Sequence, residues 1–336
     1  MAIRLKDIAA DLGVSAVTVS KVLRGKPDVG EETRQRVLQR VREVNYQPNL
    51  LARGLASGKS QTVGLIVPDL LHTFFAEFAK GLKAGLRKRG YQLILASAEE
   101  EPELEREEID TLLARGVDAL LLATCQPEGD ALASLFGVRV PCVLVDRALP
   151  GSGRPFVGTD DVAAGRLATA HLLGLGRRRI AHIAGEEFST GRDRLAGYRE
   201  ALAAVGIEPR QEWVLSRSRL EEAGDRIGEA AMAELLALPE RPEAVFCYND
   251  LAAMGAVRAV LEAGLRVPED VALVGCGNLR VSDYLRVPLT SIDQSTAEQG
   301  EQAARLTVAL LSGKAKTPDL QVRVAPKLVA RASTGA

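Results

Sequence analysis

The pattern of apolar and polar positions changes twice along the chain. In residues 1–46, single apolar residues recur at helical spacing and no strand pattern is present. These residues are Ile8, Leu12, Val19, Val22, Val37, Val41 and Val44. From Thr62 onward, short apolar runs alternate with longer amphipathic segments. The pattern therefore predicts a small helical head, a junction and an α/β body.

The body alternates between expected strands and expected helices. The apolar runs lie at 62–68, 91–97, 117–123, 141–146, 179–185, 244–249 and 271–277. The amphipathic segments lie at 73–89, 101–114, 161–175, 192–205, 219–236, 250–263 and 294–311. Such alternation predicts parallel sheets with both faces covered by helices. A body of about 270 residues is too large for one compact sheet, so we expect two α/β lobes.

The charges are unevenly distributed. The net charge of the chain is −1, yet residues 1–60 hold 11 Lys and Arg against 6 Asp and Glu. A basic head on an acidic body suggests that the head contacts a polyanion. With 46% hydrophobic and 26% charged residues, the composition excludes a largely disordered chain and a coiled-coil rod.

Neither a membrane partner nor a metal is expected. The N-terminus has charges every few residues, unlike a secretory signal, and the longest apolar runs are about half of a membrane span. Four single cysteines, with no CxxC pair, lie in apolar runs and predict buried reduced thiols in a cytoplasmic protein: Cys125, Cys142, Cys247 and Cys276. Three widely separated histidines make a zinc site improbable. No cofactor is indicated.

The segment IRLKDIAADLGVSAVTVSKVLRG (3–25) has the layout of a helix-turn-helix. Lys6–Asp11 would form the first helix, Gly13 would supply a turn with positive φ, and Ser15 would cap a second helix near Thr18. Val14, Val19 and Val22 would point inward. Gly30, followed by two glutamates, would open a third helix.

A second helix placed in this way leaves an outward face that fits a DNA major groove. That face carries Ala16, Val17, Thr18, Ser20 and Lys21. The hydroxyls suit phosphates, Lys21 can donate to guanine O6 and N7, and Ala16 and Val17 can contact thymine methyl groups. The alternative is a plain three-helix bundle without a DNA role.

The junction 47–60 cannot form a stable helix by itself. Pro48 sets a boundary, and Asn49 could cap only about one or two turns, too few for an isolated helix in water. Gly54 would destabilise a helix here by about a further 1 kcal/mol relative to alanine. If this segment is helical, a partner must hold it there.

The sequence resembles bacterial transcription regulators of the lactose-repressor/galactose-repressor (LacI/GalR) family. The resemblance begins with KDIAADLGVSAVTVSKVLRG in the head and continues through VGEETRQRVLQRVREVNYQPN and ARGLASGKSQTVGLIVPD. The body adds VLVDR, VGTDDVAAG, RLAGY, CYNDLAAMGA, PLTSIDQ and PKLVARAST, in order. The resemblance implies an α/β fold class with a three-helix helix-turn-helix headpiece, a hinge helix and a two-lobed core similar to periplasmic sugar-binding proteins.

The resemblance also implies the domain organisation. The headpiece would span 1–48 and the hinge helix with its linker 49–60. The first lobe of the core would comprise 61–161 and 292–321, and the second lobe 162–291 and 322–336.

In function, the resemblance implies a transcriptional repressor that binds a pseudo-palindromic double-stranded operator as a homodimer in the nucleoid. In the hinge, Leu55 would insert as a wedge in the minor groove, with Arg53 beside it. The alternative for Leu55 is an ordinary linker leucine. A small-molecule effector, sugar-like or another polar metabolite, would bind between the lobes, with induction and corepression both open.

By alignment, the effector would contact residues from both lobes. They are Asp69, Phe74, Phe75, Asp146 and Arg147 in the first lobe, Arg194, Asn249 and Asn278 in the second, and Gln294 at the crossover. Two aromatic rings with Asp, Asn and Arg suit a hydroxyl-rich or planar ligand. The alternatives are core positions for Phe74 and Phe75, a loop cap for Asp146 and a structural ion pair for Arg194.

One position departs from the family. The segment GCGN (275–278) has Gly277 where an acid that often grips a sugar hydroxyl is expected. A pyranose would then be held differently, or the ligand is not a simple sugar. GCGNLR also resembles part of a dinucleotide fingerprint, but Arg280 stands at its third glycine, so a tight turn is expected.

Two other functional classes compete with this interpretation. A ligand-binding receptor without a DNA role predicts an export signal and no basic helical head. An α/β enzyme predicts a catalytic motif, but the sequence holds no GxSxG, P-loop, HExxH or complete GxGxxG. The adjacent Asp160 and Asp161 are interpreted as helix caps. We therefore expect a protein that is not an enzyme.

Overall fold

The computed structural model describes residues 3–23, 25–47, 58–126, 139–185, 188–216, 224–316 and 320–336. The chain divides into two compact units, Met1–Ser60 and Gln61–Ala336, and each is described by itself. The predicted hinge with Arg53 and Leu55 lies outside the described residues.

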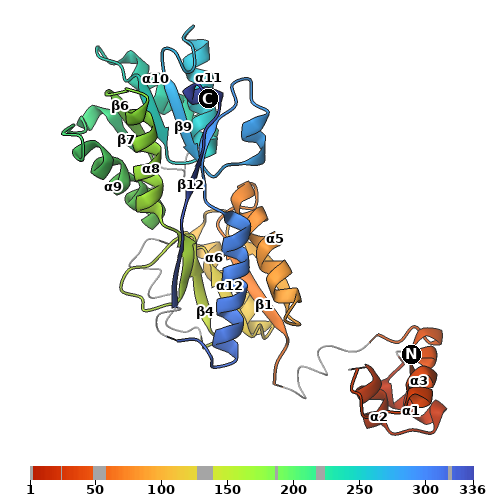
Figure 1. The fold of residues 1–336 in the computed structure, drawn as a ribbon. Helices are drawn as coiled ribbons and strands as arrows, with labels where there is room; N and C mark the ends of the chain where they lie inside the picture. The colour runs from red at the N-terminus through yellow and green to blue at the C-terminus, as the bar shows by residue number, and fades with distance from the viewer. Residues whose placement is uncertain are drawn as a thin grey trace. The chain divides into compact units, whose positions relative to one another are not determined.

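The described residues of the head form three helices, drawn in red in Figure 1. They are α1 (Leu5–Leu12), α2 (Ala16–Leu23) and α3 (Glu31–Glu43). Its buried core contains Ile8, Val37 and the predicted inward residues Val19 and Val22, and Val14, also predicted to point inward, is partly buried against it. Gly13, with φ 65°, ends α1 as expected, and Gly30 is the N-cap of α3, with two glutamates in the first turn.

The body contains two six-stranded sheets among its described residues, as the alternating pattern predicted. The first has the order β11-β5-β4-β3-β1-β2 and the second β12-β10-β9-β8-β6-β7. All pairs are parallel except β12 with β10. The strands of the first sheet are β1 (Thr62–Val67), β2 (Gln92–Ser97), β3 (Ala119–Leu122), β4 (Cys142–Val145), β5 (Phe156–Thr159) and β11 (Gln321–Val324). Those of the second sheet are β6 (Ile180–Ala184), β7 (Val214–Ser216), β8 (Ala244–Cys247), β9 (Ala272–Cys276), β10 (Thr290–Asp293) and β12 (Lys327–Val329).

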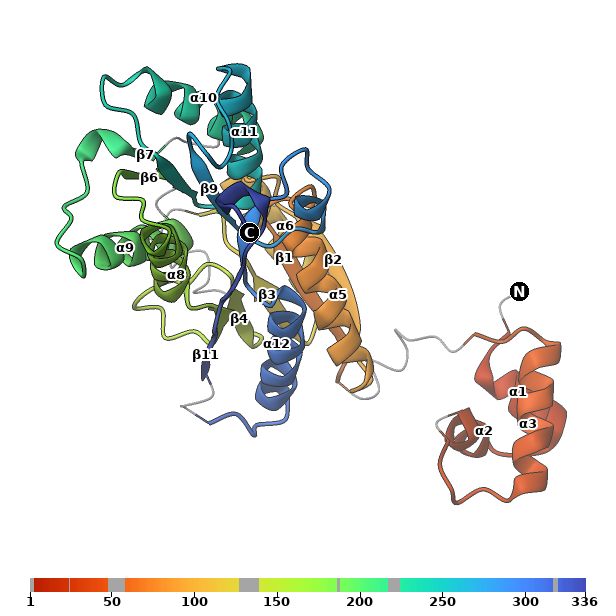
Figure 2. The same ribbon diagram turned by 45° about the horizontal axis from the view of Figure 1, so that its top comes forward.

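Helices cover both faces of each sheet. In the first lobe, α5 and α12 pack together on one face and α6 covers the other, and in the second lobe α8 pairs with α9 and α10 with α11 (Figures 1 and 2). The helices are α5 (Thr73–Arg87), α6 (Pro102–Ala114), α8 (Asp161–Gly174), α9 (Ser189–Ala203), α10 (Gly224–Ala237), α11 (Asp250–Glu262) and α12 (Thr296–Leu311). Short 3₁₀ turns are η1 (Gln211–Trp213), η2 (Arg280–Asp283) and η4 (Ala332–Thr334).

The chain crosses between the lobes three times: from β5 to α8, from β10 to α12 and from β11 to β12. Two expected boundaries need correction. Because β10 pairs with β9, residues 292 and 293 belong to the second lobe. Because β11 runs parallel to β5, with Val322 opposite Val157, residues 322–324 belong to the first.

Two further features bear on the composition. All four cysteines are buried free thiols, as predicted. None of the helices in the described part of the chain is long and apolar enough to cross a membrane.

Candidate functional site

The first candidate surface is the outward face of α2. The Thr18 backbone N–H donates to Ser15 Oγ at 3.0 Å, which is the predicted N-cap, and the two hydroxyl oxygens lie 2.9 Å apart. On the same helix Val19 is fully buried, whereas Val17 is 61% exposed. Ala16 is also exposed, and Thr18, Ser20 and Lys21 are partly exposed. The helix thus presents apolar, hydroxyl and amino groups together, which are the groups that read base edges and phosphates.

An acidic residue that the sequence reasoning missed lies beside this face. Lys21 Nζ donates to Asp28 Oδ2 at 2.5 Å, and the hydrogen bond with Lys21 lowers the pKa of the Asp28 carboxyl. Asp28 follows Pro27 in the loop between α2 and α3. Lys21 lies in α2, whereas Asp28 lies seven residues later in the loop beyond the end of that helix. Helical periodicity could therefore not predict that the two side chains meet.

The second candidate site is a small cavity between the two lobes of the core. Its volume is about 50 Å³, well below the roughly 300–1,000 Å³ typical of ligand pockets. The residues that line it are His72, Phe74, Phe75, Asp146, Arg147, Thr190, Arg194, Tyr248, Asn249, Cys276 and Gln294. Seven of the nine predicted effector residues therefore meet at one place, and a ligand of sugar size needs the lobes or their side chains to move apart.

An aromatic cluster forms the first-lobe wall of the cavity. The rings of Phe74 and Phe75 meet edge to face with centroids 5.1 Å apart, and the His72 ring lies 5.7 Å from that of Phe75. Both phenylalanines are about 4% exposed and pack in the first-lobe core with Phe78. These rings therefore occupy core positions, which was the alternative interpretation, and they also line the cavity.

Arg147, which follows Asp146 after the end of β4, contacts both lobes. Its Nη1 donates to the Thr124 carbonyl oxygen at 2.9 Å, and its Nη2 lies 3.3 Å from a Glu100 carboxylate oxygen. The guanidinium carbon lies 3.9 Å from the ring centroid of Phe188, in the second lobe. The next backbone N–H, that of Ala148, donates to Ser189 Oγ at 2.8 Å. The guanidinium is therefore held within the protein and forms part of a direct contact between the lobes.

Arg194 is held by a buried ion pair. Its Nε donates to Asp161 Oδ1 at 2.7 Å and its Nη1 to the Tyr248 carbonyl oxygen at 2.6 Å. Burial raises the pKa of Asp161, and the positive charge of Arg194 opposes that rise. The predicted alternative of a structural ion pair is present, and the same side chain lines the cavity. Gly165 allows this placement, because a Cβ there would lie 2.0 Å from the Arg194 carbonyl oxygen.

Two amide side chains complete the polar lining. Asn249 is the N-cap of α11, where its Oδ1 accepts from the Ala252 backbone N–H at 2.8 Å. Gln294, at the crossing from β10 to α12, donates from Nε2 to Thr159 Oγ1 at 3.0 Å. Asp146 has a left-handed backbone with φ 60° and supplies the carboxylate among the lining residues. Hydroxyl-rich ligands are matched by such a mixture of amide, carboxylate and guanidinium groups beside aromatic rings.

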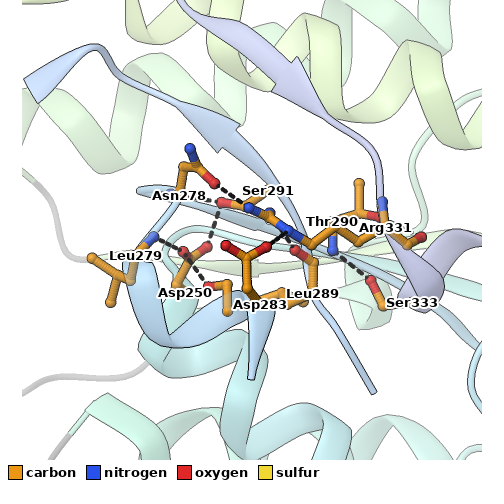
Figure 3. A network of polar contacts seen from close by, with 10 residues as sticks. Asp250, Asn278, Leu279, Asp283, Leu289, Thr290, Ser291, Arg331 and Ser333 are labelled. Carbon is orange, nitrogen blue, oxygen red and sulfur yellow. Dashed lines mark hydrogen bonds and ion pairs between the residues drawn. The ribbon is translucent and has the colours of Figure 1, made fainter. Parts of the chain in front are cut away.

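Two predicted effector residues do not line this cavity. Asp69 Oδ1 instead accepts from the Leu71 backbone N–H at 2.8 Å, within a local turn. Asn278 has φ 48°, its backbone N–H donates to Ser291 Oγ, and its Oδ1 accepts from Arg331 Nη2 at 2.8 Å (Figure 3). The sequence alone could not show this, because Arg331 lies 53 residues further along the chain.

A buried carboxylate fixes the loop that contains Asn278. Asp250 accepts hydrogen bonds from the Leu279 backbone N–H at 2.7 Å and from the hydroxyls of Ser282 and Ser291 (Figure 3). Burial raises the pKa of Asp250, and these hydrogen bonds oppose the rise. Gly277 precedes this fixed loop, so it supplies no carboxylate to the cavity, and Cys276 and Tyr248 line that side instead. Among the described residues, no group of His, Cys, Asp or Glu is arranged to hold a metal ion.

Two family models match the chain and together cover nearly all of it. Residues 4–49 match the model of bacterial regulatory proteins of the lacI family. Residues 60–326 match that of periplasmic binding proteins and the sugar-binding domain of the LacI family.

Curated relatives align over almost the whole length of both partners. The chain is 36% identical to the HTH-type transcriptional regulator GalR of Salmonella typhimurium, covering 98% of this chain and 95% of that protein. It is 32% identical to the HTH-type transcriptional repressor PurR of Mannheimia succiniciproducens, covering 98% of each.

Solved structures show the same full-length match. The Lac repressor dimer bound to operator and the anti-inducer ONPF has a TM-score of 0.88 at 28% identity and covers 100% of both chains. A complex of the transcriptional regulator CelR with cellobiose has a TM-score of 0.75 at 33% identity and covers 98% of this chain and 99% of that one.

Proposed function

Because the chain belongs to the LacI family of bacterial regulatory proteins and is thus a DNA-binding transcriptional regulator rather than an enzyme, we propose that it represses transcription from a pseudo-palindromic operator as a homodimer. A small-molecule effector bound between the core lobes controls it. The observation that carries this proposal is the capped helix α2, which buries Val19 and exposes Val17.

In this proposal α2 enters the major groove. Val17 and Ala16 contact thymine methyl groups, Lys21 donates to a guanine, and the hydroxyls of Ser15, Thr18 and Ser20 contact phosphates. Leu55 inserts between base steps in the minor groove, with Arg53 beside it, and two hinges hold one another there. Arg53 and Leu55 lie outside the described residues, so their role rests on the family alignment.

The homodimer is supported by an exposed apolar surface on the core. Leu71, before α5, is 87% exposed and Tyr284, after η2, is 77% exposed, with Leu70 and Val281 also exposed. Val281 is one of the residues that line a groove of about 1070 Å³ formed by α5, α12 and the 278–283 loop. Apolar side chains of this size on a soluble core are typical of an interface. Two copies of the chain together present two recognition helices, one to each half of the operator.

The effector is proposed to be a sugar, a sugar derivative or another polar metabolite. The aromatic wall of Phe74 and Phe75 and the polar groups of Asp146, Arg194 and Asn249 support a ligand with both a flat face and several hydroxyl groups. The solved relative in complex with cellobiose is a family member with a sugar ligand. With Gly277 in the second-lobe loop, the ligand is held on that side by Arg194 and Asn249 rather than by a carboxylate.

Control by the effector requires a change in how the lobes sit together. Beside the small cavity, the Arg147 guanidinium stacks on the Phe188 ring and the Ala148 N–H donates to Ser189 Oγ. A ligand that enters the cavity must therefore compete with these contacts between the lobes or replace them. Binding then biases the orientation of the lobes, and by linkage the effector and the operator alter one another's affinity by the same factor. As a regulator of chromosomal genes, the protein is proposed to act in the cytoplasm, on the nucleoid.

The test is selection of genomic DNA fragments by the purified full-length protein, followed by gel shift with and without candidate sugars and nucleobases. We expect a small set of fragments with two-fold symmetric sites and an affinity that changes with one ligand class. Arg194→Lys is the matched variant for the cavity, since it keeps the charge but not the planar fork. Uniform binding to all fragments at low salt would refute sequence-specific regulation.

A further inference from the structure

The loop after the recognition helix returns Asp28 to the end of that helix. Gly25, with φ 66°, closes α2: its N–H donates to the Val22 carbonyl oxygen, and the Lys26 N–H donates to that of Lys21. Arg34 of α3 then donates from Nη2 to the carbonyl oxygens of Lys26 and Val29. The loop is thus tied to α2 at one end and to α3 at the other, so the position of Asp28 between them is set by the backbone.

The contact between Asp28 and Lys21 contributes little to the stability of the head. The Lys21 and Asp28 side chains are 39% and 54% exposed, and ion pairs of such exposure are worth at most about 1 kcal/mol. What the contact does change is the charge on the outward face of α2. Before any DNA arrives, the ammonium group of Lys21 already has a carboxylate 2.5 Å away.

This arrangement distinguishes a phosphate from a base edge. An ammonium group has three N–H donors, so Lys21 can keep Asp28 and still donate to the neutral oxygen and nitrogen acceptors of a guanine. A phosphate in the same place would bring a second anion next to the carboxylate, and like charges in contact are unfavourable. Breaking the pair to bind the phosphate instead leaves Asp28 uncompensated near the polyanion.

We propose that Asp28 is a specificity-determining residue, which holds Lys21 as a reader of base edges and prevents it from serving as a general phosphate contact. The inference rests on the proposed function, namely that α2 contacts duplex DNA. Asp28 acts through Lys21 and does not itself need to touch the DNA.

The experiment compares two probes with the full-length protein: a duplex selected in vitro from a random library by the wild type, and an unselected duplex of the same length. Affinities are measured between 50 and 200 mM salt for the wild type, Asp28→Asn, Lys21→Ala and the double variant. Asp11→Asn is the matched control, because Asp11 forms a similarly exposed ion pair with Arg40, at 2.6 Å, and its replacement changes the net charge equally.

For Asp28→Asn we expect tighter binding to the unselected duplex, with a salt dependence steeper by about 0.9 in log–log slope, as for one additional neutralised phosphate. Between 50 and 200 mM salt, this difference in slope changes the affinity by about 3.5-fold. Because only the affinity for the unselected duplex rises, the ratio of selected to unselected affinity should fall below the wild-type value, and most strongly at 50 mM salt. In the Lys21→Ala background the substitution should not change that ratio, and Asp11→Asn should shift both probes alike.

Several outcomes would overturn the inference. If Asp28→Asn leaves the affinity ratio at the wild-type value, or lowers it as much in the Lys21→Ala background, Asp28 does not act through Lys21. If Asp11→Asn lowers the ratio equally, the effect is one of net charge. Thermal unfolding of each variant shows that the head is folded. A wild type that selects no preferred duplex would instead refute the proposed function.

Discussion

Replacing His182 by phenylalanine is expected to remove a pH-dependent part of the stability of the second lobe. His182 lies on β6, fully buried, and stacks on the rings of Phe246 and Tyr198 with centroids 4.7 and 5.2 Å away. Its Nδ1 lies 2.8 Å from the Phe246 carbonyl oxygen, and its Nε2 has no hydrogen-bond partner among the described residues. The site therefore accommodates a neutral imidazole and has no acceptor for the second proton.

The sign and size of the effect follow from the pKa. Burial lowers the pKa of His182 from 6.5 to about 4, and the positive charges of Arg194 and Arg199 act in the same direction. In the unfolded chain the imidazole takes up a proton as the pH falls through 6.5, whereas in the folded chain it does so only near 4. The stabilisation is present above pH 6.5 and is lost as the pH falls from 6.5 to 4. At about 1.4 kcal/mol per pKa unit, the loss is about 3 kcal/mol.

The assay is urea unfolding of the full chain at a series of pH values from about 7 to 4.5, followed by near-ultraviolet circular dichroism. The wild type should lose stability more steeply toward acid than His182→Phe, and the difference between them isolates His182 because both proteins keep Asp161 and the other carboxylates. His171→Gln is the control, because His171 is only partly buried, so the lowering of its pKa should matter less. Parallel stability curves for wild type and His182→Phe would refute the reasoning.

Three further perturbations test the cavity and the interface. Arg194→Met should lower the free energy of unfolding by about 3–5 kcal/mol, because it leaves the Asp161 carboxylate buried without its partner. Adding Asp161→Leu to the same chain should recover much of this loss. A loss below about 1 kcal/mol for Arg194→Met would contradict a stabilising ion pair. Gly165→Ala should cost about 1–3 kcal/mol and weaken effector binding in calorimetry, because the new Cβ would lie 2.0 Å from the Arg194 carbonyl oxygen; unchanged effector affinity would show that Arg194 does not contact the ligand. Tyr284→Glu should shift the protein to monomers in sedimentation and weaken operator binding, and an unchanged dimer would place the interface elsewhere.

The sequence predicted the elements with strong local signals. The runs at 62–68 and 271–277 became β1 and β9 because their apolar residues fill both faces of a parallel sheet. The strands β5, β7, β10, β11 and β12 were not predicted, because none of them is continuously apolar as the equally short β3, β4 and β8 are. Each depends on its neighbours for its pairing. The strand β11 alternates between half-buried and exposed residues at the edge of a sheet, so local pattern could not assign it to a lobe.

The cavity was predicted better on its first-lobe side than on its second. Phe74 and Phe75 lie in the first turn of α5, after the loop that follows β1, so the start of this helix positions them. Asn278 lies in the loop after β9, where Arg331 donates to its side-chain oxygen, and it does not line the cavity. Nothing in the sequence around Cys276 and Tyr248 predicts contact with a ligand. They line the cavity because β9 ends at Cys276 and Tyr248 directly follows the end of β8. Long-range hydrogen bonds, rather than local pattern, decide which residues near a strand end become lining residues.

The order of the strands has a consequence for synthesis. Both sheets receive a strand from the last part of the chain, β11 in one and β12 in the other, visible as the dark blue segment in Figure 1. Each lobe therefore lacks an edge strand until the ribosome has translated this segment, although the head, which leaves the ribosome first, can fold early. A nascent chain therefore completes α2 before either lobe of its core is complete. A prematurely terminated copy would keep a folded head on an incomplete core and could occupy DNA without responding to any signal.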